Sequence, residues 1–256
     1  MAEFTVMFRK ELLEQLRKKK LLIMAAVFLF VAVGSPIIAK LTPEILRSIT
    51  VPGITFNIPE PTFNDAVSQF IRNISQIALL VLVFVVAGAI SDEKIKKTLE
   101  VILTKPISRA KFVLAKFVGY FVSITAIFLM ASLIFYFYTV TTFVSFSFAN
   151  FSVLALIVLL YILMIVAITI LSSTIVGSSI LAGGIGFISY ILIGTVFSLV
   201  GSISKYSPNL IFSHYQDVLT HGWRGDLLIP LVIIISVILI SIISSVALFR
   251  KQEIER

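Results

Sequence analysis

Residues 150–171 read NFSVLALIVLLYILMIVAITIL, a run of 22 residues without a charged side chain. A helix of about 20 apolar residues, rising about 1.5 Å per residue, crosses the hydrocarbon core of a bilayer. A helix that is apolar on every face needs an apolar environment all around it. This stretch therefore predicts a transmembrane helix.

Five further uncharged runs of similar length lie on either side of it, at residues 21–39, 74–90, 117–138, 180–202 and 227–249. Across the 256 residues, 59% are hydrophobic, only 13% are charged, and the mean hydropathy is +1.09. Soluble domains carry about 25% charged residues, so a bilayer must solvate this chain. The sequence predicts an all-α polytopic membrane protein with six transmembrane helices in a single domain, residues 1–256.

Lysine and arginine are unequally divided between the two sides of the predicted membrane protein. With six spans, the side that carries both chain ends holds 16 of these residues and the other side holds five. Basic residues are retained on the cytoplasmic side. We therefore expect a cell-membrane protein with both termini in the cytoplasm. Basic residues beside apolar spans meet anionic lipid, so the net charge of +8 does not indicate nucleic-acid binding.

The predicted spans carry no ionisable side chain in their interiors, which argues against a proton-coupled carrier, a charge-selective channel and a membrane enzyme with a carboxylate or metal centre. The chain has no cysteine, and no glycine is followed directly by lysine, so thiolate chemistry and a phosphate-binding loop are excluded. His214, Asp217 and His221 have metal-like spacing, but we interpret them as solvated loop residues. We expect no catalytic, cofactor or metal site in this chain.

The first 20 residues predict an amphipathic helix that lies at the membrane surface. Phe4, Phe8, Leu12 and Leu16 recur every four residues and are flanked by basic side chains. Such a helix lies in the headgroup region with its apolar side chains toward the acyl chains. Glu11 interrupts the apolar arc, and we expect it to pair with a neighbouring segment.

A second polar segment separates the second and third predicted spans, and residues 91–109 read SDEKIKKTLEVILTKPISR. Its apolar residues fall on one helical face: Ile95, Leu99, Ile102 and Leu103. The other face carries two pairs of opposite charge spaced four residues apart, Glu93 with Lys97 and Lys96 with Glu100. Pro106 ends this helix, and Ser108 can cap the next span. The ionic face is available to a soluble partner; the alternative is a solvated loop that only follows the positive-inside distribution.

Small residues recur along the fifth predicted span. Ser178, Ala182 and Gly186 are four residues apart and form a stripe on one helical face. Small side chains let another helix approach closely. We interpret this stripe as a packing surface within the chain, and the alternative is a subunit interface or a moving surface.

The polar segment also has a recognisable motif. The pattern Asp92-Glu93-x4-Thr98-Leu99-Glu100-x5-Pro106-Ile107-Ser108-Arg109, followed by Lys116, resembles the loop between spans two and three of ABC type 2 permeases. The opening Phe8-Arg9-Lys10-Glu11-Leu12, the Ser207-Pro208 pair and the ending Phe249-Arg250-Lys251 extend the resemblance over the whole chain. Lys97 departs from the family pattern, which usually has glycine before Thr-Leu-Glu.

The resemblance implies a permease subunit that pairs with a second permease copy or homologue and with two ATP-binding-cassette ATPase subunits. ATP and magnesium would bind to those partners, so this chain would not be an enzyme by itself. The ATPases would contact an N-terminal elbow helix, residues 1–20, and a short coupling helix between spans two and three. The implied elbow residues are Phe8, Arg9, Lys10 and Glu11, and the implied coupling residues are Glu93, Thr98, Leu99, Glu100, Leu103 and Pro106.

Two other functions are open at this stage. An ATP-independent carrier or channel would act alone in liposomes, although the uncharged spans argue against it. A membrane scaffold or assembly factor would hold a partner through the same polar helices without transport. The implied function is export driven by ATP hydrolysis in a partner chain.

Overall fold

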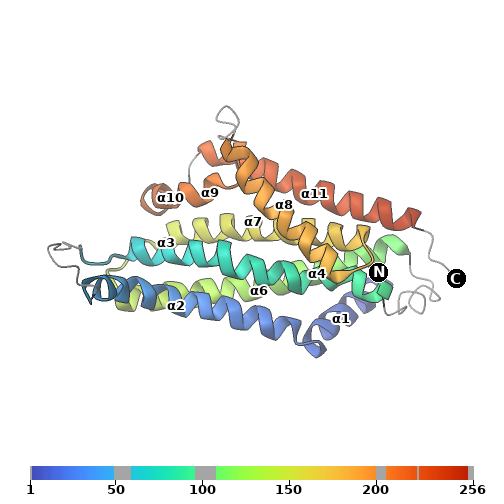
Figure 1. Cartoon of the computed structure of the whole chain (residues 1–256), viewed down its shortest axis with the longest axis horizontal. Helices are drawn as coiled ribbons and strands as arrows, with labels where there is room; N and C mark the ends of the chain where they lie inside the picture. Colours follow the sequence, from blue (N-terminus) through green and yellow to red (C-terminus); the bar gives the residue numbers. More distant parts are fainter. Residues whose placement is uncertain (1, 49–58, 96–107, 200–205, 224, 253–256) are drawn as a thin grey trace.

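The computed structural model describes residues 2–48, 59–95, 108–199, 206–223 and 225–252. Within these ranges every regular element is a helix, and the helices form an elongated bundle (Figure 1). The long helices are α2 (Lys20–Ser48), α4 (Leu79–Ile95), α6 (Arg109–Thr142), α7 (Phe148–Ile175), α8 (Ser179–Leu199) and α11 (Leu228–Lys251).

Shorter elements connect them. α1 (Ala2–Arg17) precedes α2, and α3 (Phe63–Asn73) continues through a π-helical turn, η1 (Ile74–Ala78), into α4. The short helices α9 (Leu210–Ser213) and α10 (Tyr215–His221) and the turn η3 (Gly225–Leu227) precede α11.

Five helical stretches are long and apolar enough to cross a membrane: Lys20–Leu46, Phe63–Ile95, Arg109–Thr142, Phe148–Ile175 and Gly225–Lys251. α8 is also apolar, but the part whose side chains the structure describes, Ser179–Ile193, is shorter than a full crossing. The all-helical, multi-span architecture is therefore confirmed, and the count of six spans stays a prediction.

The helices extend beyond the predicted spans. α2 continues through Pro43 to Ser48, beyond the predicted span at 21–39, and α6 begins at Arg109, before the predicted span at 117–138. Charged residues ended the predicted spans, but they do not end a helix that leaves the bilayer. The predicted cap is present: Ser108 Oγ accepts a hydrogen bond from the backbone N–H of Lys111 at 3.3 Å.

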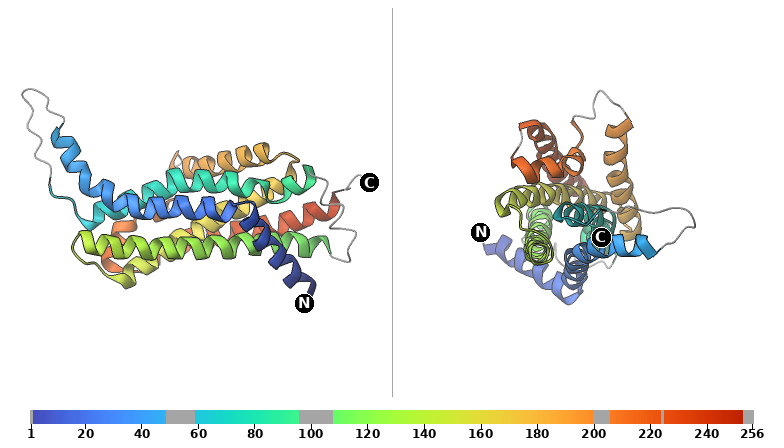
Figure 2. Two further views of the ribbon diagram at one scale, coloured as in Figure 1. Left: turned by 90° about the horizontal axis from the view of Figure 1, so that it is seen from below. Right: turned by 90° about the vertical axis from the view of Figure 1, so that its left-hand side faces the viewer.

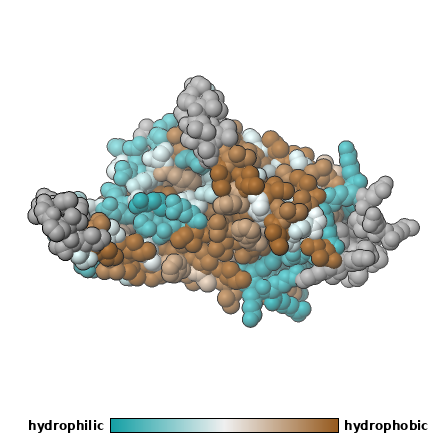
Figure 3. All heavy atoms as spheres, viewed as in Figure 1, coloured by the Kyte–Doolittle hydropathy of each residue, from teal (hydrophilic) through white to brown (hydrophobic). Residues whose placement is uncertain are grey.

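α7 is the central helix of the bundle. It packs against α4, α6, α8 and α11, and the end-on view of Figure 2 shows it between α11 and α6. Its residues Tyr161, Ile162 and Val166 are fully buried, as expected for a span that is apolar on every face. By contrast, many apolar side chains of α8 and α11 are exposed, and Figure 3 shows apolar residues over the middle of the molecule. A bilayer would cover these surfaces.

The segment before α11 packs along the side of α7. Tyr161 donates a hydrogen bond to Asn209 Oδ1 at 2.7 Å, and the Phe212 ring meets the Tyr161 ring edge-on at 4.7 Å between centroids. Asn150 Nδ2 donates to the Leu219 carbonyl at 2.8 Å. Tyr161 lies halfway along α7, about 20 Å from its start at 1.5 Å per residue. The segment is thus docked on the bundle instead of forming a separate loop.

Candidate functional site

Lys116, in the second turn of α6, is the centre of a buried group of charges. Its Nζ lies 2.6 Å from Glu11 Oε2, 2.6 Å from Glu93 Oε1 and 3.9 Å from Glu14 Oε2. Lys10 Nζ lies 3.1 Å from the same Glu93 oxygen and 3.5 Å from Glu14 Oε2. These five residues, the Lys116 cluster, join α1, α4 and α6.

The centre of the Lys116 cluster is almost closed to solvent. The side chains of Lys116, Glu11 and Glu93 are 3%, 4% and 4% exposed. A buried charge is costly unless it is paired and hydrogen-bonded, and here each buried charge has an opposite charge within 3 Å. α1 is therefore fixed to the bundle by ion pairs at a defined register.

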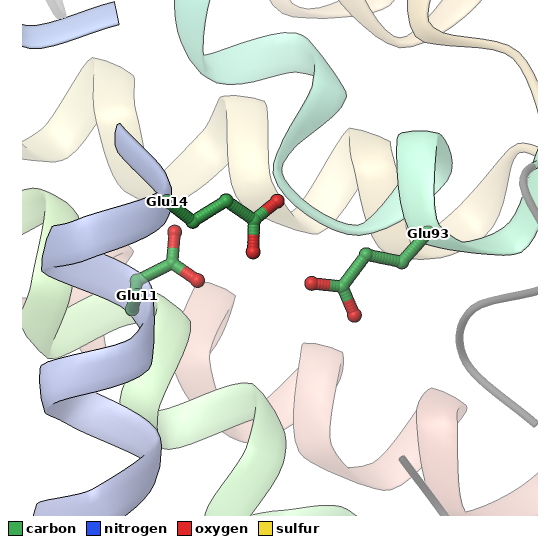
Figure 4. A group of neighbouring side chains, drawn as sticks. All are labelled: Glu11, Glu14 and Glu93. Carbon is green, nitrogen blue, oxygen red and sulfur yellow. The ribbon is translucent and has the colours of Figure 1, made fainter. Parts of the chain in front are cut away.

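The three carboxylates raise the question of a metal site. Ligand oxygens of Glu11, Glu14 and Glu93 lie within 4.8 Å of one another, and Figure 4 shows their carboxylates pointing toward a common centre. Carboxylate oxygens at such spacing can hold a divalent cation. Lys116 and Lys10 already supply the positive charge between them, so we interpret the group as an ion-pair cluster.

Glu14 connects the cluster to the surface, and its pKa is shifted. Burial raises the pKa of the Glu14 carboxyl, but Lys116, Lys18 and Lys10 together lower it from 4.5 to about 2. The charged form is thus favoured in the folded chain. Lys18, the residue after the end of α1, donates a hydrogen bond to Glu14 Oε1.

The lowered pKa of Glu14 predicts a pH-dependent contribution to stability. Because the folded pKa lies below the unfolded value of 4.5, the contribution is complete above pH 4.5 and is lost as the pH falls toward 2. We expect Glu14→Gln to lower the melting temperature in detergent by a constant amount between pH 8 and pH 5. That difference should shrink between pH 4.5 and pH 3. An equal difference at pH 7 and pH 3 would contradict the assignment.

Gly119 allows α1 to approach α6 closely at the Lys116 cluster. A Cβ atom on Gly119 would lie 2.5 Å from Glu11 Cγ and 3.2 Å from Glu11 Cβ. Gln15 Nε2 donates to Glu11 Oε1 at 3.2 Å on the same face. The absence of a side chain at position 119 is therefore what places the Glu11 carboxylate beside Lys116.

Asp92, the neighbour of Glu93, contacts a different set of helices. Its carboxylate lies 3.6 Å from Lys20 Nζ at the start of α2 and accepts a hydrogen bond from Ser179 at the start of α8. Lys20 Nζ also donates to the hydroxyl of Tyr120, on α6, at 3.1 Å. Asp92 thus links α4 to α2 and α8.

Lys94, the next residue, reaches the end of α7. Its Nζ donates to the Thr174 carbonyl at 2.5 Å, and Gln252 Nε2 donates to the same oxygen at 2.8 Å. Arg109 Nη1, at the start of α6, donates to the Gln252 carbonyl at 2.7 Å and to the Arg250 carbonyl at 3.1 Å. Cations stabilise helix C-termini, where carbonyl groups lack helical partners. Lys94 and Arg109 therefore cap α7 and α11.

Three consecutive residues at the end of α4 contact five other helices at this end of the bundle. We call Asp92, Glu93 and Lys94 the charged turn: Asp92 contacts α2 and α8, Glu93 contacts α1 and α6, and Lys94 contacts α7.

A family model described as ABC-2 family transporter protein matches residues 5–254. The chain belongs to the ABC-2 transporter family. No curated protein matches it.

ABC-2 permeases are membrane subunits, and a separate ATP-binding-cassette subunit hydrolyses ATP for them. In this ABC-2 chain the charged turn overlaps the start of the predicted coupling segment, because Glu93 belongs to both. Glu93 is the predicted coupling residue that falls within the described part of the chain, and it lies inside the Lys116 cluster. The remaining predicted coupling residues lie outside the described residues: Thr98, Leu99, Glu100, Leu103 and Pro106.

The predicted elbow residues of the ABC-2 chain have different environments. Lys10 and Glu11 belong to the Lys116 cluster, Phe8 is half-buried and Arg9 is exposed. α1 turns Met7, Glu11 and Gln15 toward the bundle, whereas Leu16, which we placed on its apolar line, is 58% exposed. The face of α1 that meets the bundle is thus partly polar, and the predicted contact of its apolar line with lipid stays a prediction.

In the ABC-2 chain, the predicted small-residue stripe lies along α8, and Gly186 is the member for which contacts with other helices are described. Ser178 immediately precedes α8, and its carbonyl accepts a hydrogen bond from the Ala182 N–H at 2.9 Å. A Cβ on Gly186 would lie 3.0 Å from Thr169 Oγ1 on α7 and 3.3 Å from Val83 Cγ1 on α4. These contacts place α8 close to α4 and α7.

Sequence reasoning missed the charged partners Lys116, Asp92 and Lys94 as site residues. Asp92 and Lys116 stood in the quoted motif, but no role was attached to them. One signal was available: Lys116 interrupts an otherwise apolar stretch of α6, and a lysine there needs a partner when it is buried. Glu11 on α1 was the matching anomaly.

Proposed function

We propose that this chain is the permease subunit of an ATP-driven exporter in which the charged turn passes movements of partner ATPases to the membrane helices. One observation supports the proposal above all: consecutive residues Asp92, Glu93 and Lys94 contact α2, α8, α1, α6 and α7. A displacement of the charged turn would therefore move most of the helices in the bundle together.

The proposed topology has six crossings, with α8 as the fifth. α1 and the last turn of α11 lie at the same end of the bundle in Figure 1, which fits an even number of crossings. The excess of lysine and arginine places this end in the cytoplasm. The single domain, residues 1–256, would lie in the cell membrane with lipid around α8 and α11.

The proposed complex contains a second permease copy or homologue and two ATPase subunits that bind ATP and magnesium. ATP binding closes the two ATPases, which press on the elbow helix and on the coupling segment that follows the charged turn. The buried ion pairs suit this task because separating one leaves an unpaired buried charge, so they keep α1 attached to α4 and α6. Repacking between the two permeases would then open a path across the membrane.

The proposal is tested by purifying the tagged full chain from its native membrane in mild detergent and reconstituting the complex in nanodiscs. We expect an ATPase subunit to co-purify. Glu93→Gln should retain that subunit but reduce ATP turnover roughly fivefold or more, because coupling energies between sites are typically 1–3 kcal/mol. Glu100→Lys, on the predicted partner surface, should lose the subunit.

Glu44→Gln is the matched control, because Glu44 is an exposed carboxylate at the far end of α2. It should leave both co-purification and ATP turnover unchanged. Flux from liposomes that contain the chain alone, without nucleotide, would instead indicate a carrier or channel. A stably bound partner without ATP turnover would indicate a scaffold.

A further inference from the structure

The helix formed by α3, η1 and α4 is interrupted at one point. At Ile74–Ala78 it has π-helical geometry, and the N–H of Leu79 pairs with the Ile74 carbonyl. A π turn loosens the regular backbone pairing and often marks a functional position. Here the carbonyl of Ser75 accepts a hydrogen bond from the hydroxyl of Tyr190, on α8, at 2.6 Å.

α2 is interrupted beside it. Pro36 lies inside α2, so it has no N–H to pair with the preceding turn. The hydroxyl of Ser35, which is fully buried, donates to the Val31 carbonyl at 2.6 Å, a contact that also bends helices. The left view of Figure 2 shows that α2 bends in its second half.

The two interruptions are hydrogen-bonded to each other. Asn73, the last residue of α3, donates from Nδ2 to Ser35 Oγ at 3.0 Å. The weak points of two packed helices therefore lie at the same level of the bundle. α2 contains a second proline, Pro43, in the segment beyond this level. Because the weak points at Ser35–Pro36 and Ile74–Ala78 are paired across two packed helices, they can act as one hinge axis.

Beyond this axis, residues 37–48 of α2 and 63–73 of α3 pack together. Their contacts with the rest of the molecule include two stacked ring pairs, Phe70 with Phe135 at 4.1 Å and Phe63 with Phe146 at 4.9 Å between centroids. α3 also buries Val67 and Ile71 in the apolar core. Stacked rings are non-ionic contacts worth about 0.5–1.5 kcal/mol each beyond area burial. Such contacts can open and close repeatedly.

We propose that residues 37–48 and 63–73 form a distal lid that swings about Ser35–Pro36 and Ile74–Ala78. Tyr190 and Asn73 latch the hinge, and the two stacked ring pairs hold the lid closed. α4 runs from the hinge to the charged turn, about 20 Å from Leu79 to Asp92 at 1.5 Å per residue. The lid therefore opens or closes the end of the bundle opposite the Lys116 cluster.

The chain contains no cysteine, so paired spin labels report the lid position directly. One label pair, Glu44→Cys with Thr141→Cys, joins the exposed lid to the exposed end of α6. A control pair, Leu22→Cys with Val122→Cys, joins the halves of α2 and α6 on the other side of the hinge. The full chain in nanodiscs is measured alone, so the result does not depend on the proposed ATPase partner.

We expect the lid pair to show two distance populations and the control pair to show one. Tyr190→Phe removes only the latch hydroxyl and should shift the lid populations roughly fivefold toward the longer distance, as the loss of one hydrogen bond predicts. Tyr161→Phe removes a hydroxyl bonded to Asn209, away from the hinge, and should change neither pair. Pro36→Ala should reduce the longer population.

Hydrogen exchange of the same variants gives an independent readout. Tyr190→Phe should speed exchange at residues 74–79 roughly fivefold, and Tyr161→Phe should not. A single narrow lid distance in the native chain and in Tyr190→Phe, with unchanged exchange, would overturn the proposal. The π turn would then be a static irregularity of the helix.

Discussion

Lys116→Met is expected to lower the free energy of unfolding by about 3–5 kcal/mol, because it leaves buried carboxylates without their central counter-charge. Glu11 and Glu93 each lie 2.6 Å from Lys116 Nζ, and both are almost inaccessible to water. Within the Lys116 cluster, Lys10 is then the cation that remains to balance the carboxylates of Glu11, Glu14 and Glu93. The loss should appear as a large drop in melting temperature in detergent, together with loss of α1 docking.

Two matched variants separate charge from the effect of a lost side chain. Lys40→Met removes an exposed lysine from α2 and should change the melting temperature little. Lys116→Met combined with Glu11→Gln and Glu93→Gln should recover much of the lost stability, since neutral replacement of a whole buried ion group is often tolerated. Equal melting temperatures for Lys116→Met and Lys40→Met would show that the Lys116 cluster contributes nothing to stability.

Gly119→Ala is expected to detach α1 and to cost about 1–3 kcal/mol, as overpacking of a close helix contact does. The added Cβ would lie 2.5 Å from Glu11 Cγ, near the root of a side chain whose carboxylate is held by Lys116. Alanine alone would favour a helix over glycine by about 1 kcal/mol. A net loss of stability would therefore show that the added Cβ clashes with α1 at its contact with α6.

Gly34→Ala is the control for this prediction, because a Cβ at Gly34 in α2 meets no atom within 4 Å. It should leave stability unchanged or slightly higher. Limited trypsin digestion reports docking of α1, since Lys19 forms the turn between α1 and α2 with a φ of 57°. We expect faster cleavage there in Gly119→Ala only. Identical cleavage rates in the two variants would refute the contact.

Much of the fold could be predicted because the spans are set by hydrophobic burial. The run at 150–171 forms the interior of α7, and the run at 74–90 forms η1 and most of α4. Helix ends were less predictable. A charged residue ends an apolar run in the sequence, but hydrogen bonding and capping decide where the helix itself ends.

The candidate site could be predicted only in part, because it depends on pairing over long sequence separations. Glu93, Lys10 and Glu11 were identified through the family motif, and Glu11 was expected to have a partner. Nothing in a local pattern indicates that Lys116 is this partner, since the two charges meet only when α1 crosses α6. The same limit applies to Lys94, whose acceptor is a backbone carbonyl of α7 and so has no side-chain signature.

The Lys116 cluster also constrains the order in which the chain assembles during synthesis. Lys10 and Glu93 are 83 positions apart, and Lys116 emerges from the ribosome later still. The carboxylates of α1 must therefore stay hydrated at the membrane surface while the first helices insert. A nascent chain arrested before α6 should have a protease-accessible N-terminus, and one arrested after α6 should protect it.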